Sequence, residues 1–252
     1  TATVISRIIN LVIVVLLGAV LVKAKQHPER ESNREVMGQI IRIGLPSACE
    51  TAIYNVSMTL VIRFLNQMDA QGLNVTARSY TMQITNFSYC VGAALAQANA
   101  IMTGWHIGAK EYDACDRGTR KAAIIGVIVA VILETMFALC SGWIMQLFSK
   151  DPQMVSLVGK LLAIDIVLEM GRVTNLVYGQ ALKTSGDAVF PVVMGACFMI
   201  LCSVGGTYLF GIRLGLLAVG AYIGMAGDEC VRAVGMYLRW KSGKWKNKGL
   251  VD

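Results

Sequence analysis

The sequence predicts an all-α integral membrane protein in which about seven helices cross the bilayer. Of its 252 residues 55% are hydrophobic, and its mean hydropathy of +0.57 exceeds what a soluble domain of this length can bury. The apolar residues fall into runs of about twenty or more, the length that crosses a hydrocarbon core as a helix. These runs lack the alternation of barrel strands. The spans are expected at residues 3–22, 43–65, 81–105, 122–148, 155–182, 188–212 and 214–238.

The basic residues gather after the first, third, fifth and last spans, and few occupy the alternate loops. Basic loops face the cytoplasm. We therefore expect a multi-pass protein of the plasma (inner) membrane with residue 1 outside and a cytoplasmic C-terminus. An odd number of spans also places the two ends on opposite sides. The net charge of +7 follows from this topology, so the lipid bilayer, and not nucleic acid, is the expected partner.

The loops divide the chain into four parts. Residues 1–24 are expected to form a helix that belongs partly to something upstream, since the chain begins without Met and is expected to be a fragment. Residues 25–42 form a cytoplasmic linker with a short interfacial helix at 36–43, after which Gly44-Leu45-Pro46 opens the second span. Short connections predict that residues 43–238 form one six-helix lobe. Residues 239–252 form a basic cytoplasmic tail.

Charged residues lie inside several of the predicted spans. A charge at the bilayer centre costs about 2.5 to 3.5 kcal/mol on insertion scales, so each needs a partner, a proton or a water-filled cavity. Such residues are typical of ion and substrate pathways. They are Glu50, Glu134, Asp165, Glu169, Arg172, Asp228, Glu229 and Arg232.

The fifth span carries the richest polar face. Asp165, Glu169 and Arg172 follow at i, i+4 and i+7, with Asn175 beside them, so they share one side of a helix. One of the two acids is left without a base, and a buried unpaired acid holds a proton or binds a cation. The alternative is a structural Arg172–Glu169 pair, with Asp165 near the outer water.

Two further spans carry polar faces. Glu50, Tyr54 and Ser57 repeat the i, i+4, i+7 spacing on the second span, where Glu50 is either an ion ligand or a solvated residue at the cytoplasmic end. On the third span, Gln83 and Asn86 share a face, and these amides can ligate an ion or bond to each other.

The fourth and last spans hold the remaining acids. Glu134 has no base within a turn, and it is expected to be protonated if it faces the helix bundle. Asp228 and Arg232, at i and i+4, are expected to form a structural pair near the cytoplasmic end. On the same helix, Gly220 and Gly224 predict a face where another helix approaches closely.

Enzyme chemistry and metal sites are not expected. The seven cysteines form no CxxC pair, and His27 and His106 lie in or beside loops. No nucleophile and base motif occurs. The sequence predicts neither a catalytic residue nor a cofactor other than a coupling ion.

Five short motifs, in this order and spacing, resemble the bacterial branch of the multidrug and toxic compound extrusion (MATE) transporters. They are GLPSACE at 44–50, GWHIGAKEYD at 104–113, EMGRVTNL at 169–176, GDAVFP at 186–191 and DECVR at 228–232. The resemblance implies the sixth helix and C-terminal lobe of a twelve-helix antiporter that exports xenobiotics in exchange for Na+ or H+. The missing N-terminal lobe would be its partner, and its substrates would be small, cationic and lipophilic.

The resemblance also implies which residues couple transport to the cation. In some members acids of the seventh and tenth helices form a cation site, and by helix order these correspond to Glu50, Asp165 and Glu169. Glu169 takes first place, because the family's seventh-helix acid lies deeper, about where Tyr54 stands here. The expected supporting residues are Arg172, Asn175, Tyr54, Gln83 and Asn86.

Two alternatives stay open. A flippase for lipid-linked saccharides shares the superfamily plan, but its cavity should be basic, whereas acids are expected to outnumber the arginines that face this one. A seven-helix receptor fits the predicted orientation of the two ends.

Overall fold

The computed structural model describes residues 2–21, 33–68 and 72–248, which are helical with short turns between them and contain no strand. The chain divides into two units, Thr1–Ile41 and Arg42–Asp252. The first unit contains α1 (Ala2–Leu21), which is apolar over Val4–Leu16. α2 (Asn33–Met68) begins in the first unit and continues into the second. The expected all-α architecture is confirmed.

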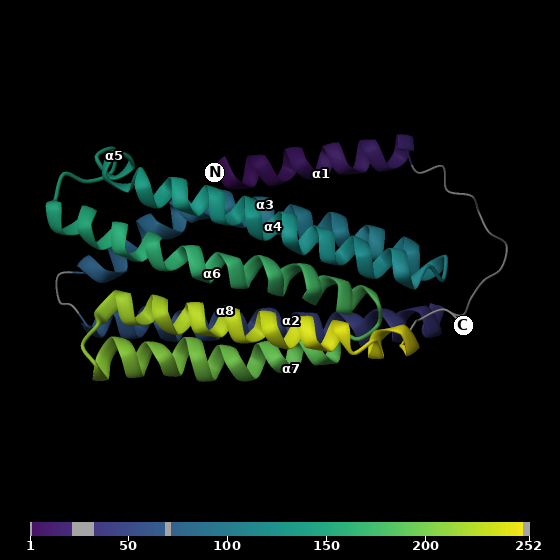
Figure 1. Ribbon diagram of the computed structural model, residues 1–252. Coiled ribbons are helices and arrows are strands. Elements are labelled where there is room, and N and C mark those ends of the chain that lie inside the picture. The colour runs from purple at the N-terminus through teal and green to yellow at the C-terminus, as the bar shows by residue number, and fades with distance from the viewer. Residues whose placement is uncertain (1, 22–32, 69–71, 249–252) are drawn as a thin grey trace. The chain divides into compact units, whose positions relative to one another are not determined.

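The second unit contains the remaining helices, labelled in Figure 1. They are α3 (Leu73–Gly108), α4 (Tyr112–Leu139), α5 (Ser141–Met145), α6 (Pro152–Thr184), α7 (Val189–Phe198), η1 (Met199–Val204), η2 (Thr207–Arg213), α8 (Leu217–Lys241) and η3 (Lys244–Asn247). α7, η1 and η2 form one continuous helix over Val189–Arg213, so the described residues agree with seven long helices.

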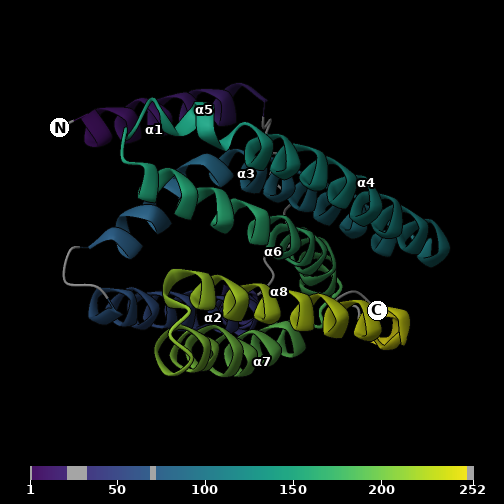
Figure 2. The ribbon, with the colours of Figure 1, turned by 60° about the vertical axis from the view of Figure 1, so that its left-hand side comes forward.

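Two groups of helices meet along α6 and α8. α3, α4 and α6 pack on one another, and α8 packs on α6 and on the helix formed by α7, η1 and η2. Both ribbon views place the second-unit part of α2 beside α7 and α8 (Figures 1 and 2). One apolar core includes Leu65, Leu161 and Tyr222, and a second includes Val177 and Trp240. The site described below lies where these groups of helices face each other.

Local sequence signals mark the ends of α6. Asp151 precedes the helix, and its side chain accepts a hydrogen bond of 3.0 Å from the backbone N–H of Gln153. Pro152 occupies the first turn, where a missing N–H costs nothing. After the helix, Gly186 adopts φ +88°, a conformation that favours glycine. These signals keep α6 in register with the helices around it.

The helix that follows α6 is wound more loosely over η1 and η2, which are π-helical. The hydroxyl of Thr207 donates to the carbonyl oxygen of Ser203 at 2.6 Å. On its other side this helix lies close to α8, because a Cβ on Gly224 would fall 2.9 Å from the backbone of Gly206. The expected close approach at Gly220 and Gly224 is confirmed, and π-helical turns are frequent at functional sites.

Three predicted boundaries are wrong. α2 is continuous from Asn33 and contains Pro46, so there is no separate interfacial helix at 36–43. Proline biases the backbone against a helix but is tolerated within membrane helices. α3 begins at Leu73 and not at residue 81, and the apolar run 122–148 is divided into α4 and α5. Hydropathy detects apolar length, but it does not detect turns or polar helical ends.

The predicted basic tail is also shorter than expected. α8 continues to Lys241, and the side chains of Trp240 and Trp245 are each 2% exposed. Their rings stack with centroids 4.2 Å apart, and the indole N–H of Trp240 donates to Asp116 at 2.7 Å. The part of residues 239–252 that the structure describes is therefore packed on the lobe, held by aromatic contacts that charge counting misses.

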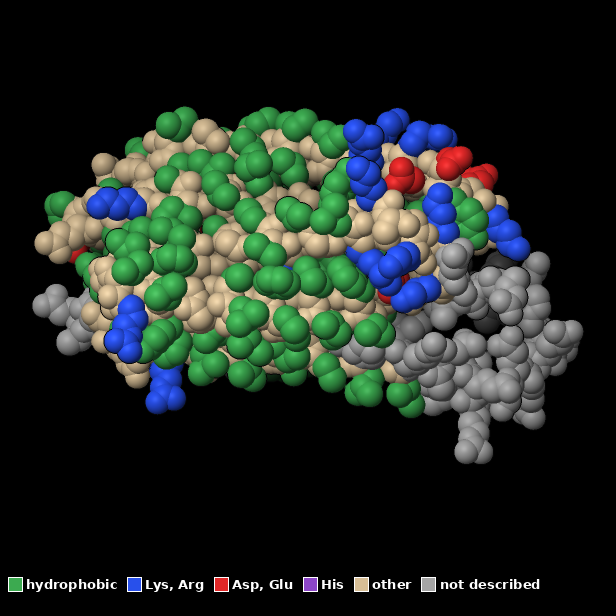
Figure 3. Space-filling model, turned by 60° about the horizontal axis from the view of Figure 1, so that its bottom comes forward, with side chains coloured by type: hydrophobic (Ala, Val, Ile, Leu, Met, Phe, Trp, Pro, Cys, Tyr) green, Lys and Arg blue, Asp and Glu red, His purple; other side chains and the backbone are tan. Residues whose placement is uncertain are grey.

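The outer faces suit a lipid environment. Two helices, Tyr112–Leu139 and Val189–Arg213, are long and apolar enough to span a membrane by length and composition. They expose rows of apolar side chains, among them Ile124, Ile128 and Ile132 on the first. Figure 3 shows hydrophobic side chains across the middle of one face and lysines and arginines at its ends. Soluble monomers rarely expose apolar patches of this kind.

Candidate functional site

A cavity of about 650 Å³ opens between α2, α3, α6, α8 and the helix that begins with α7. Among the described residues, four acids and four bases line it. The acids are Glu50, Asp165, Asp228 and Glu229, and the bases are Arg78, Arg172, Lys183 and Arg232. The acids outnumber the three arginines, as expected, but Lys183 makes the numbers of acids and bases among the described lining residues equal. Sequence reasoning placed Arg78 outside the third span and treated Lys183 as a loop residue, but both side chains reach the cavity.

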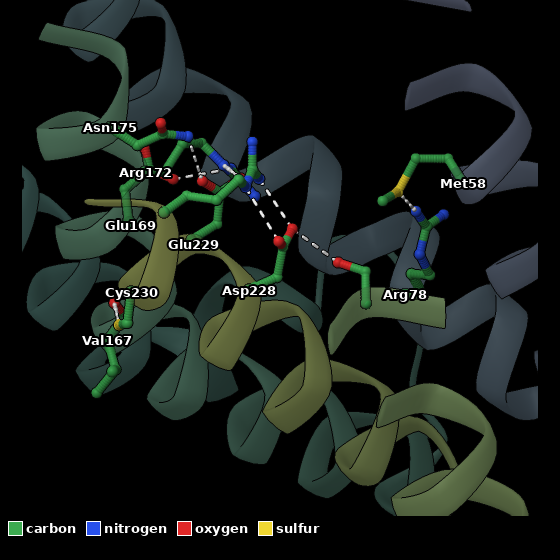
Figure 4. A network of polar contacts seen from close by, with 11 residues as sticks. Met58, Arg78, Val167, Glu169, Arg172, Asn175, Asp228, Glu229 and Cys230 are labelled. Atoms are coloured by element: carbon green, nitrogen blue, oxygen red, sulfur yellow. Dashed lines mark hydrogen bonds and ion pairs between the residues drawn. The ribbon is translucent and has the colours of Figure 1, made fainter. Parts of the chain in front are cut away.

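Glu229 is the centre of the polar network in this cavity (Figure 4). It accepts a hydrogen bond of 3.0 Å from the amide of Asn175, and it lies 2.9 Å from Arg232 and 3.6 Å from Arg172. These contacts join α6 to α8. Its importance was missed because one position on a helix does not reveal which groups a neighbouring helix presents.

Glu169 lies behind Arg172. Its Oε2 accepts a hydrogen bond of 2.8 Å from Arg172, so the structural pair considered from the sequence is formed. The Glu169 side chain is fully buried and is not among the described residues that line the cavity. Its Oε1 has no hydrogen-bond partner in the described part of the chain. Arg172 is thus shared between Glu169 and Glu229.

Asp165 is the acid that faces the cavity with spare hydrogen-bonding capacity. The residue is 2% exposed and lies in the cavity lining. Its Oδ2 has no partner among the residues described. A buried carboxylate oxygen without a donor is costly as an anion, and it is a position where a cation or a proton is stabilising.

Asp228 and Arg232 form the expected contact. Two hydrogen bonds of 3.0 and 2.9 Å join the guanidinium to the carboxylate, and the hydroxyl of Ser203 adds a third donor at 2.9 Å. The pair also lines the cavity, where Arg232 reaches Glu229 at 2.9 Å. The pair therefore ties the π-helical segment to α8 at the cavity wall.

Of the polar residues expected on α2 and α3, Glu50, Tyr54 and Asn86 line the cavity and Gln83 does not. Glu50 is 2.6 Å from Lys183 of α6, so it is neither unpaired nor fully solvated. The amide of Gln83 is exposed instead, and a supporting role at this cavity is not favoured for it.

Glu134 of α4 lies outside the cavity. Its side chain is fully buried, and neither of its oxygens has a hydrogen-bond partner in the ranges that the structure describes. No group of three or more His, Cys, Asp or Glu side chains in those ranges is arranged to hold a metal ion.

A helical lobe with apolar outer faces and a charged cavity between its helices is the architecture of an integral membrane transporter. The MatE family model matches residues 46–209. The chain therefore belongs to the MatE family, as the resemblance indicated, and this favours a transporter over a receptor or an enzyme.

The relatives agree with this assignment. The chain is 33% identical to the uncharacterized transporter YisQ of Bacillus subtilis, over 99% of the chain and 55% of that protein. It is 22% identical to the probable multidrug resistance protein NorM of Pasteurella multocida, over 83% of the chain and 46% of that protein. The crystal structure of the eukaryotic MATE transporter AtDTX14 superimposes with a TM-score of 0.83 at 16% identity, covering 95% of the chain and 54% of that structure. The chain spans about half the length of these relatives.

Proposed function

We propose that the chain is the sixth helix and C-terminal lobe of a cation-coupled antiporter that exports small cationic amphipathic compounds. It would work with the N-terminal lobe of the same protein and take up Na+ or H+, and its C-terminus would face the cytoplasm. The observation that carries this proposal is Asp165, a buried carboxylate in the cavity wall with an oxygen that no described group satisfies. A cation or a proton supplies the missing partner.

Arg172 supplies a route from cation binding to movement. It hydrogen-bonds to Glu169 at 2.8 Å and lies 3.6 Å from Glu229 on the other helix. When a proton or cation neutralises the acids of α6, the attraction between Arg172 and Glu169 weakens. Arg172 then moves towards Glu229, which is still charged. That exchange would change the contact between α6 and α8, and such a two-state contact is what alternating access needs.

The test is dye efflux from cells that express the full-length gene. We would compare wild type, Asp165→Asn and Glu169→Gln while varying the Na+ and proton gradients separately. The expected result is efflux driven by one of the two gradients in wild type and lost in both variants. Asp113→Asn, on the exposed first turn of α4, is the matched control and should keep efflux. Intact efflux in both α6 variants would refute this assignment of the coupling residues.

Arg78 favours a second candidate, a flippase for lipid-linked saccharides. Arg78 lines the cavity and is 6% exposed. Its one described hydrogen bond is a 3.7 Å contact to the sulfur of Met58, and no carboxylate in the described ranges pairs with it. A buried guanidinium without an anion is costly and suits a phosphate group of a ligand.

Arg78→Met separates the two candidates. An exporter of cationic dyes should keep its efflux in this variant, because the substrate does not need the guanidinium. A flippase should lose movement of a fluorescent polyprenyl-phosphate saccharide across proteoliposome membranes. If wild type moves the lipid and not the dye, the flippase replaces the antiporter as the function.

A further inference from the structure

Glu134 is a buried acid that is not among the described residues lining the cavity. It lies on the face of α4 that also carries Ala130 and Gly126, which are buried one and two turns earlier. The Glu134 side chain is fully buried, and both of its oxygens lack a hydrogen-bond partner among the residues that the structure describes. A carboxylate ion that accepts no hydrogen bond is among the most costly groups to bury.

The helices around Glu134 pack closely against one another. α3, α4 and α6 approach closely through small residues on this face. A Cβ on Gly92 of α3 would lie 2.7 Å from Val173 of α6, and a Cβ on Gly126 of α4 would lie 2.6 Å from the same side chain. These contacts close the interface on the side of Glu134 that carries Gly126, and Glu134 and Ser88 themselves are 0% and 1% exposed.

Charged and polar groups of α6 and α3 lie near Glu134. α6 presents two acids, Asp165 and Glu169, and one base, Arg172, whose charges act on Glu134. Arg172 is already engaged by Glu169 and Glu229. α3 presents Ser88, whose buried hydroxyl is close enough to Glu134 to stabilise its charge but makes no hydrogen bond of standard geometry within the described residues.

The hydrogen-bonding groups in this interface are short of donors. Both oxygens of Glu134 and Oε1 of Glu169 are acceptors without a donor in the part of the chain described, and the hydroxyl of Ser88 can supply one proton. One further proton on Glu134 removes its charge and adds the second donor that the group lacks.

We propose that Glu134 is a proton-binding site of this lobe, closed off from the cavity in the α3–α4–α6 interface and connected to it through Glu169. The inference rests on the proposed antiport and assigns a proton as a coupled ion. Asp165 and Glu169 are the acids of α6 whose charges act on Glu134, and Glu169 also contacts Arg172. Its Oε2 accepts from Arg172, which lines the cavity, and its Oε1 lies on the side of Gly92 of α3.

Proton transfer between the two acids conserves charge. The O–H bond of Glu134 breaks as an O–H bond forms on Glu169, which leaves Glu134 charged and Glu169 neutral. Of the two acids that contact Arg172, Glu169 and Glu229, only Glu229 then carries a negative charge. The closed site would therefore store the proton whose movement releases Arg172, the step on which the proposed coupling depends.

The experiment is infrared spectroscopy of the purified full-length protein at neutral pH, recorded in H2O and in D2O. A buried neutral carboxyl gives a carbonyl band that shifts when its proton is exchanged for deuterium. The expected result is such a band in wild type, its loss in Glu134→Gln and its retention in Glu169→Gln. Glu111→Gln makes the same change on a side chain that is 59% exposed, and it should keep the band.

Two outcomes overturn the proposal. One is that wild type shows no protonated-carboxyl band, and the other is that Glu134→Gln keeps the full band. If Glu134→Gln does not fold, wild type labelled with [13C]glutamate decides, because a band that fails to shift with the label does not come from a glutamate. The readout needs no transport, so wild type that shows the band but moves no dye contradicts the proposed antiport alone.

Discussion

The close contact between α8 and the π-helical segment makes Gly224→Ala the sharpest test of the packing. A Cβ at Gly224 would lie 2.9 Å from the carbonyl oxygen of Cys202, 2.9 Å from Gly206 and 3.0 Å from the backbone nitrogen of Thr207. All three atoms belong to the backbone, so none can rotate away. Ordinary contact begins near 3.4 Å, and the two helices must therefore separate by about 0.5 Å.

The expected cost is that of overpacking, about 1 to 3 kcal/mol. Gly227→Ala is the matched control, because Gly227 is exposed on the same helix and a Cβ there would meet nothing within 4 Å. Both substitutions gain the same helix propensity, about 1 kcal/mol, so their difference isolates the contact. For a chain of this size about 2 to 4 °C accompanies each kcal/mol, and Gly224→Ala should melt about 2 to 12 °C below Gly227→Ala.

The assay is thermal unfolding of the full-length protein in detergent. The folded fraction that remains after heating is measured by size-exclusion chromatography. Equal melting temperatures for the two variants would refute the reasoning, because they would mean that the backbones of the two helices are not in contact at Gly224.

The remaining predictions concern ion pairs at the helix ends. Burial opposes ionisation of Asp187, but hydrogen bonds from Arg239 at 2.6 Å and Lys248 at 2.7 Å hold the pKa of Asp187 below its usual value. An acid whose pKa is lower in the folded state than in the unfolded state stabilises the fold at pH values above the unfolded pKa, which is about 3.9 for aspartate. This stabilisation is lost as the pH falls through the folded-state pKa. Asp187→Asn should cost about 2 kcal/mol at neutral pH and reduce the loss of stability below about pH 4, measured as melting temperature against pH; unchanged curves would contradict the pairing. The Glu50–Lys183 pair, 2.6 Å long and about one-fifth exposed on each side chain, should contribute about 1 kcal/mol. Lys183→Met should therefore lower the melting temperature by about 2 to 4 °C. Exchange of the two charges in Glu50→Lys with Lys183→Glu should restore most of this loss, and a double variant worse than either single one would show that the two side chains do not interact.

Much of the fold could be predicted from the sequence, because bilayer thickness requires apolar runs of a definite length. Six of the seven expected spans correspond to one long helix each, and the fourth corresponds to α4 with the short α5. The contacts predicted within one helix, Glu169 with Arg172 and Asp228 with Arg232, are also present. Helical geometry places residues three and four apart side by side, so such contacts need no knowledge of neighbouring helices.

Contacts between helices could not be predicted in this way. Asn175 meets Glu229 across 54 positions, and Glu50 meets Lys183 across 133. Arg78 reaches the cavity because α3 starts earlier than hydropathy indicates. Apolar length reports only that a segment is a membrane helix, whereas the face it turns to its neighbours depends on which side chains pack against which.

The sequence by itself determined the number and order of the helices, their apolar character and the local ion pairs, since these follow from backbone geometry and from the thickness of lipid. Only the tertiary structure decided that Glu229 is the centre of the network, that bases match acids around the cavity and that Glu134 is closed in between three helices. These features depend on how the helices are rotated and placed against one another, which is set by close packing over long separations in sequence.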